Sequence, residues 1–142
     1  MTTGLSTLDS SLQITNEWLS ELEKELNTND REKAYHALRV VLHTLRDRLT
    51  PQEAVDLAAQ LPLILRGMYF ENWNISKTPV KMETREEFMD CVNERMNNEI
   101  PERLPEMIGA VMKVLREHTT EGEINNIVSQ LPKPLAQMVC SC

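Results

Sequence analysis

The sequence predicts an all-α fold, a compact helical domain built from two tandem, pseudo-symmetric four-helix repeats. Two observations lead to this prediction. The chain has only two Trp, two Tyr and two Phe, so its core must be mostly aliphatic, which favours helices over a β-sandwich. The chain also matches itself without gaps after a shift of 70 residues, which aligns QLPLILRGM at 60–68 with QLPKPLAQM at 130–138.

Length and composition indicate one soluble domain. A chain of 142 residues can bury a core without disulfides or metals, and its 41% hydrophobic and 26% charged residues are typical of globular proteins. We interpret residues 1–142 as a single domain, with repeat one at about 14–70, a connecting loop at 71–83 and repeat two at about 84–140. The net charge of −7 includes no basic block, so we expect no nucleic-acid partner and no membrane partner.

The sequence also favours a cytoplasmic location. The amino-terminal segment MTTGLSTLDSS lacks the basic start and apolar run of a signal peptide. No uncharged apolar stretch approaches the roughly 20 residues that a membrane span needs. Three cysteines form no recognisable disulfide framework, which suits a reducing compartment.

Two helices open each repeat, because large apolar residues recur there at helical spacing. They are expected at 15–27 and 31–49 in repeat one, and at 85–97 and 103–118 in repeat two. We expect residues 5–12 to form an extra turn before the first helix.

A threonine and a glutamate mark the start of the third helix in each repeat. TPQE (Thr50–Glu53) and TEGE (Thr120–Glu123) have the form of a capping box, as does TREE (Thr84–Glu87) at the start of repeat two. In this device the threonine hydroxyl accepts from the third amide of the helix, and the glutamate carboxylate accepts from the threonine amide.

A proline ends the third helix of each repeat. Pro62 and Pro132 push the preceding residues away from helical angles, so Leu61 and Leu131 should be extended and point inward. A short fourth helix begins at each proline. The glutamines before the two leucines are expected to bond unpaired carbonyls at the helix ends.

The segment Ala34–Trp73 resembles a bacterial family known as domain of unknown function 2267. The resemblance rests on Leu38-Arg39, Val41-Leu42-His43, Leu45-Arg46-Asp47-Arg48-Leu49, Gln60-Leu61-Pro62, Arg66-Gly67, Trp73 and Glu86-Glu87-Phe88. Phe70 stands where a tyrosine is more usual. The resemblance implies an all-helical bacterial domain, and it brings no established activity.

Five residues form a candidate binding surface: Arg39, His43, Arg66, Tyr69 and Trp73. The two arginines offer forked donors for carboxylate or phosphate, and the histidine titrates near neutral pH. Repeat two does not keep them, and residues kept by one repeat only are better site candidates. The aromatic pair, with Phe70, is either an exposed patch or a buried lid between the repeats.

Other residues recur in both repeats and are interpreted as structural. Arg46 is expected to pair with a nearby carboxylate such as Glu53, because Arg116 and Glu123 recur together in repeat two. The capping residues Thr50 and Thr120 and the prolines of the two corners belong to the same class.

No motif for catalysis, a cofactor or a metal is present, so we predict a chain without catalytic residues. The first functional hypothesis is a non-catalytic adaptor or regulatory module that binds an unidentified protein partner or itself. The alternative is a protein that binds a small anionic metabolite in a cleft between the repeats. A redox or metal role for the Cys140/Cys142 tail is a third, weaker hypothesis.

Overall fold

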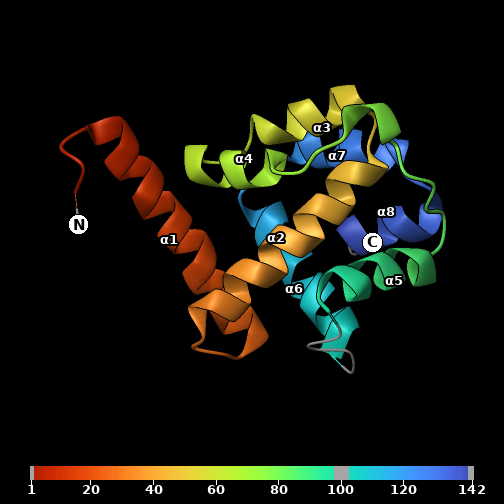
Figure 1. Ribbon diagram of the computed structural model, residues 1–142, viewed down its shortest axis with the longest axis horizontal. Helices are drawn as coiled ribbons and strands as arrows, with labels where there is room; N and C mark the ends of the chain where they lie inside the picture. Colours follow the sequence, from red (N-terminus) through yellow and green to blue (C-terminus); the bar gives the residue numbers. More distant parts are fainter. Residues whose placement is uncertain (1, 98–102, 141–142) are drawn as a thin grey trace.

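The computed structural model describes residues 2–97 and 103–140, and this part of the chain contains eight α-helices, one 3-10 turn and no β-strand. The elements are α1 (Ser6–Leu26), α2 (Arg31–Arg48), α3 (Pro51–Ala58), α4 (Leu63–Phe70), η1 (Ile75–Lys77), α5 (Arg85–Arg95), α6 (Leu104–Glu117), α7 (Glu121–Gln130) and α8 (Lys133–Cys140). They pack into a compact all-α domain (Figure 1). The predicted all-α class is confirmed. No helix within the described ranges has the length and apolar content required to cross a bilayer.

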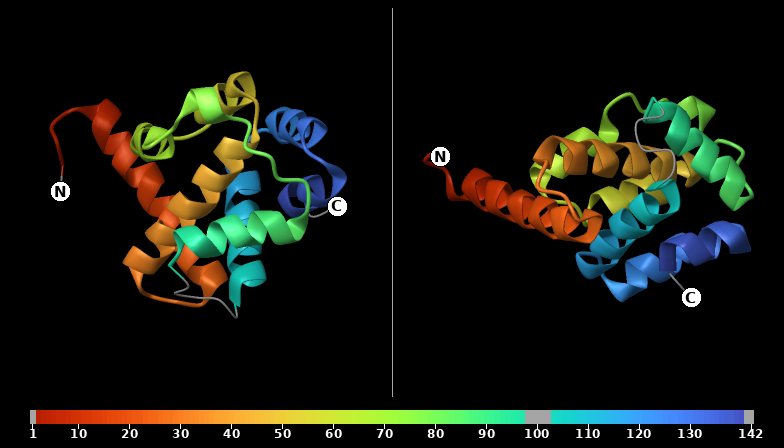
Figure 2. Two further views of the ribbon diagram at one scale, coloured as in Figure 1. Left: turned by 45° about the vertical axis from the view of Figure 1, so that its right-hand side comes forward. Right: turned by 90° about the horizontal axis from the view of Figure 1, so that it is seen from below.

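Helix α2 forms the centre of the fold. Every residue from Val40 to Asp47 is buried, and α2 packs against α1, α4, α5 and α6 (Figure 2). A helix that is buried on all sides needs neighbours on all sides. Helix α2 is therefore the element on which helices from both halves of the chain assemble.

Helix α1 is longer than the sequence pattern predicts, because it begins at Ser6 rather than near residue 15. Asp9 stabilises this start by accepting from the backbone N and the hydroxyl of Thr3, at 2.7 and 2.9 Å. The buried face here carries Ser11 and Thr15. Small polar residues contribute nothing to a hydrophobic period, so the pattern missed the front of this helix.

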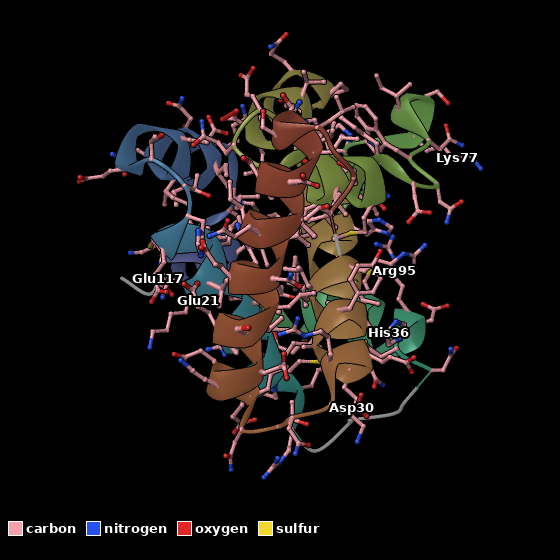
Figure 3. The ribbon with its side chains drawn as sticks, turned by 90° about the vertical axis from the view of Figure 1, so that its left-hand side faces the viewer. Glu21, Asp30, His36, Lys77, Arg95 and Glu117 are labelled. Carbon is pink, nitrogen blue, oxygen red and sulfur yellow. The ribbon has the colours of Figure 1, made fainter. Side chains whose placement is uncertain are left out.

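The end of α6 is tied to the middle of α1. The ring of His118 stacks on Trp18 with 4.7 Å between ring centroids, and its Nε2 lies 2.5 Å from Oε2 of Glu21. Five residues earlier, on α6, Lys113 bonds Glu25 at 2.7 Å. Figure 3 shows Glu21 on the side of α1 that faces the end of α6. Contacts between distant parts of the chain thus position α1.

The three threonine caps form, but only one has the complete capping box. The hydroxyls of Thr50, Thr84 and Thr120 each accept from the third amide of their helix. At Thr84, Oε1 of Glu87 also accepts from the threonine amide, at 3.2 Å. The predicted return bond is absent at the other two described caps, which is a correction to the sequence-based prediction.

Glutamines from the opposite half of the chain replace the missing return bonds. Oε1 of Gln130 accepts from the amide and the hydroxyl of Thr50, at 3.4 and 2.9 Å. Oε1 of Gln60 accepts from the amide of Thr120 at 3.1 Å. The prediction that these glutamines bond helix-end carbonyls was therefore wrong. The two bonds fasten the start of α3 to the end of α7, and the start of α7 to the end of α3.

The glutamates released from capping are buried where α3 meets α7. Glu53 is 2% exposed and Glu123 is 8% exposed. The expected pair of Arg46 with Glu53 does not form, because Arg46 bonds Asp47 of its own helix instead. The glutamates are thus buried without a cationic partner among the described ion pairs.

Replacing Gln130 with alanine is expected to lower the free energy of unfolding by about 1 kcal/mol, because Thr50 loses the acceptor of its amide and its hydroxyl. Urea unfolding followed by circular dichroism measures the loss. Gln137→Ala is the control, since this glutamine lies exposed on α8. Equal losses in both variants would contradict a role for Gln130 in capping.

The structure agrees with the predicted proline corners in the backbone of Leu131, in the burial of both leucines and in the starts of α4 and α8. Leu131 is extended, with φ −99° and ψ 148°, and Leu61 and Leu131 are both buried. Helices α4 and α8 begin at the residues that directly follow Pro62 and Pro132. The local rule for residues around proline therefore places both helix starts.

The connecting segment 71–83 lies along α2. It contains the 3-10 turn η1 and is otherwise irregular. The amide of Val80 donates to the carbonyl of Asp47 at 2.7 Å, and Nε of Arg48 donates to the carbonyl of Met82 at 2.7 Å. These bonds hold the segment against the carboxyl end of α2.

Candidate functional site

The predicted binding residues of α2 bond to groups of the protein itself. Nε of Arg39 lies 3.3 Å from Oε1 of Glu71. His43 is buried, and its Nε2 lies 2.8 Å from the carbonyl oxygen of Met68. Burial lowers the pKa of His43, so the neutral ring donates its Nε2 proton to this carbonyl. His43 thereby joins α2 to α4.

The predicted binding residues of α4 are also engaged. Arg66 donates from Nε to the carbonyl of Ala58 and from Nη2 to that of Leu61, both at 3.0 Å. Tyr69 is fully buried, and its hydroxyl donates to the carbonyl of Ala54 at 2.8 Å. Burial raises the pKa of Tyr69. Both side chains therefore satisfy carbonyls of α3 and of the corner that follows it.

The aromatic cluster is partly covered. Phe70 and Trp73 are half-buried, with ring centroids 5.4 Å apart, and Phe70 lies edge-on to Tyr69 at 5.2 Å. Nε1 of Trp73 is buried and has no hydrogen-bond partner within the described part of the chain. Of the two alternatives for this cluster, the arrangement is closer to a buried lid than to an exposed patch.

The structure places Arg39 and His43 on α2, Arg66 and Tyr69 on α4, which packs against α2, and Trp73 shortly after α4. Each of them except Trp73 has at least one hydrogen bond to an acceptor of the protein. An anion would have to bind the remaining guanidinium donors, because Nε of both Arg39 and Arg66 already has an acceptor in the protein. A binding role for the five residues stays a prediction.

An ionic network that is buried at Arg46 and Asp47 joins α2, α4 and α5. Arg46 is 2% exposed, and its Nη1 donates to the carbonyls of Tyr69 and Glu71 at 2.6 and 2.8 Å. Its Nε bonds Oδ1 of Asp47 at 2.8 Å, and Oδ2 of Asp47 accepts from Arg95 at 2.7 Å. Figure 3 shows Arg95 beside α2.

Sequence reasoning missed Asp47 and Arg95 as members of this network. Asp47 was noted only as part of the segment that carries the family resemblance, and Arg95, which follows no recognisable motif, lies 48 residues from Asp47 in the chain. In the second half, Nη1 of Arg116 donates to the carbonyl of Val139 at 2.7 Å. Arg116 is therefore structural in the same way as Arg46, although it makes fewer bonds.

Helices α1 and α4 pack against each other, and four exposed apolar residues lie on them or, for Leu5, directly before α1. We call the residues Leu5, Ile14, Leu63 and Ile64 the α1–α4 surface; they are between 39% and 60% exposed. The amide of Ile64 donates to the hydroxyl of Ser11 at 3.2 Å, which fixes the start of α4 against α1. Figure 1 shows the front of α1 projecting from the body beside α4. Sequence reasoning missed this surface, because periodicity does not show which apolar residues stay exposed.

Two surface hollows lie away from the contact between α3 and α7. One is at the turn between α1 and α2, where Arg31 bonds Glu23, Asn16 and Ser20. The other, of about 200 Å³, lies between α5, α6 and α8 and is lined by Arg85, Pro105, Ile108, Gly109, Gln137 and Met138. Neither of these hollows contains the candidate residues.

Residues 15–138 match the model of a family described as an uncharacterized conserved protein, DUF2267. The chain belongs to this family. The resemblance of the segment Ala34–Trp73 is thereby confirmed, and the match extends from the middle of α1 to the end of α8. Comparison with curated proteins gives no match.

The described part of this DUF2267 chain holds no cluster of three or more histidine, cysteine, aspartate or glutamate residues suited to a metal ion. Cys91 carries a free thiol on α5, and burial raises its pKa, which leaves it a weak nucleophile at neutral pH. Cys142 lies outside the described residues, so a role for the Cys140/Cys142 tail stays a prediction.

Proposed function

We propose that this DUF2267 chain is a non-catalytic, cytoplasmic interaction module that binds a protein through the α1–α4 surface. One observation carries the proposal. Of the seven large apolar residues that the described part of the chain leaves exposed, four belong to this surface. Single exposed apolar residues are ordinary, but a gathering of them marks an interaction site.

The shape of the surface favours a protein partner. The front of α1 projects beside the start of α4, so a partner helix or sheet can pack along both (Figure 1). Hydrogen bonds of Asp9 to Thr3 and of Ser11 to Ile64 hold this region in one conformation before binding. A preformed surface loses little conformational entropy on association, which strengthens binding.

We also infer that the eight helices form two tandem repeats, about 14–70 and 84–140, related by the 70-residue offset. Helices α4 and α8 each span eight residues and begin at equivalent positions. The bonds of Arg46 to Tyr69 and of Arg116 to Val139 are equivalent under the same offset. The two glutamine caps are reciprocal. An ancestral helical unit that was duplicated accounts for all three observations.

The proposed function is tested with a photoreactive amino acid placed at Leu63 and, in a separate variant, at Val55. Both positions are exposed and apolar, but Val55 lies on α3, outside the surface. We expect a cross-linked protein in native cells from position 63 only. Replacing Ile64 with glutamate should lower its yield at least about tenfold, because a buried apolar contact then contains a charge.

A product of twice the chain's mass would identify self-association, and any other mass would identify a different protein partner. Equal products from positions 63 and 55, or a yield unaffected by Ile64→Glu, would refute the proposed surface. Capture of a small anion that depends on Arg66, with no protein product, would favour the metabolite-binding alternative instead.

A further inference from the structure

Two carboxylates meet at the contact between α3 and α7. Glu53 and Glu123 are the third residues of these helices and lie 70 residues apart in the sequence. Each has a buried Oε2 without a hydrogen-bond donor within the described residues. Two buried acceptors that face each other are both satisfied if one of them carries a proton, because a protonated carboxyl group is a donor.

The helix caps explain why the glutamates lie here. At Thr84 the third-residue carboxylate returns to the cap and stays exposed. At Thr50 and Thr120 a glutamine of the opposite half provides an acceptor for the cap. The two glutamate side chains are consequently free to turn inward, and the same glutamine bonds hold the two helix starts together.

The immediate surroundings on α3 and α7 do not neutralise two negative charges. On α3, Asp56 adds a further negative charge to the site. On α7, Asn126 bonds Glu123. On α8, which packs on α7, the one charged side chain is Lys133, and it is exposed.

The neighbouring groups of α2 and α4 are engaged elsewhere. Tyr69 faces the pair from α4, but its hydroxyl proton is donated to Ala54. Arg66 of α4 is directed to carbonyls at the end of α3, and Arg46 of α2 is bound to Asp47 and to the end of α4. Two ionised carboxylates at this place would therefore repel each other in a medium of low dielectric constant.

We propose that Glu53 and Glu123 form a buried proton-binding site, in which one shared proton holds α3 against α7. The protonated carboxyl group of Glu53 donates to the carboxylate of Glu123. When the proton leaves for solvent, two like charges face each other and the contact between α3 and α7 loosens. The site makes the association of the two halves at this end of the molecule sensitive to pH.

The acid–base properties of the pair agree with this assignment. Burial, then the charge of Glu123, raises the pKa of Glu53 from its ordinary value of 4.5 to about 7. Burial also raises the pKa of Glu123. The proton therefore belongs to the pair and leaves near neutral pH.

The direction of the pH effect follows from these shifts. The folded protein holds the proton up to about pH 7, whereas the unfolded chain loses it near pH 4.5. Between these values the folded state binds more protons, so the stability from this site falls as pH rises. It is complete below about pH 4.5 and is lost above about pH 7.

The first test compares the thermal unfolding midpoint of the wild type and of Glu53→Gln across pH 4.5 to 8. The wild-type midpoint should fall over this window by several degrees, on the order of 5 °C. In Glu53→Gln the amide is a permanent donor to Glu123, so the curve should flatten. At pH 8 the variant should be at least as stable as the wild type. Glu123→Gln should behave alike.

Glu87→Gln is the matched control, because this glutamate occupies the same place after a capping threonine but is exposed. Hydrogen bonds from the amides of Glu83 and Thr84 and from the hydroxyl of Thr84 lower its pKa. Its stabilising effect is lost only below pH 4.5, as pH falls through the folded pKa. The wild-type slope between pH 4.5 and 7 should therefore persist in this variant.

A second measurement uses the wild type alone, so it does not depend on whether a variant folds. The side-chain carboxyl carbons of the wild type are followed by ¹³C NMR, and one Glu53 or Glu123 signal should titrate near pH 7. Titration of both in the ordinary range would overturn the proposal, as would a slope that persists in Glu53→Gln. The thermal unfolding experiments are repeated with added magnesium and with added calcium. If either cation raises the thermal unfolding midpoint of the wild type saturably, but not that of Glu53→Gln, a cation fills the site. This result would also overturn the proposal.

Discussion

Replacing Arg46 with methionine is expected to lower the free energy of unfolding by about 3–5 kcal/mol, a large fraction of the stability of an ordinary domain. The variant leaves the carbonyls of Tyr69 and Glu71 without their donor. It also removes one of the two cations that pair with Asp47, which stays buried. An unsatisfied buried acceptor costs about 1–3 kcal/mol, and an incompletely paired buried carboxylate adds to this.

Arg116→Met is the matched control for that substitution. Arg116 is partly exposed and donates to one described carbonyl, that of Val139. Its loss should cost about 1 kcal/mol. Guanidinium unfolding of both variants gives the two values, provided that the slope against denaturant is unchanged. Arg46 and Arg116 make equivalent bonds to the carbonyls of Tyr69 and Val139. Similar losses in the two variants would show that the further bonds of Arg46 around Asp47 add nothing to stability.

A fragment of residues 1–78 is expected to lack a cooperative unfolding transition. Helix α2 is buried on all sides from Val40 to Asp47, and two of its neighbours, α5 and α6, belong to the second half. The fragment also loses the stacking of His118 on Trp18 and the bond of Arg95 to Asp47. Exposure of these apolar faces removes much of the burial that offsets chain entropy.

Thermal unfolding of the fragment, followed by circular dichroism with its mass checked by sedimentation, tests this expectation. Addition of residues 79–142 as a second fragment should restore a cooperative transition, because the two pieces then rebuild the shared core. A monomeric 1–78 fragment that melts cooperatively on its own would contradict the inference that the halves fold together.

Local rules predicted the helices wherever the determining residues are neighbours in the chain. Pro62 and Pro132 place the starts of α4 and α8, since the proline ring constrains the residue before it. Threonine hydroxyls cap α3, α5 and α7 as expected. The front of α1 was missed because Ser11 and Thr15 occupy its buried face, where an apolar residue would have extended the period.

The candidate site was predicted less well, for a different reason. Four of the five residues chosen from the sequence lie on α2 and α4, which are in contact, but Arg66 and Tyr69 bond carbonyls of α3 and of the corner after it. Chemical type shows that an arginine is able to bind an anion. It does not show whether the arginine already donates to a backbone carbonyl of the protein, because that depends on how α4 packs against α3.

The sequence by itself determined the all-α class, the family and most helix boundaries, because these depend on residues within one or two turns of each other. Only the tertiary structure decided which partners the polar side chains bond. Gln130 is 80 residues from the threonine that it caps, and the freed Glu53 turns toward α7 as a result. A hydrogen bond needs its donor and acceptor about 3 Å apart, and across such a separation packing alone sets that distance.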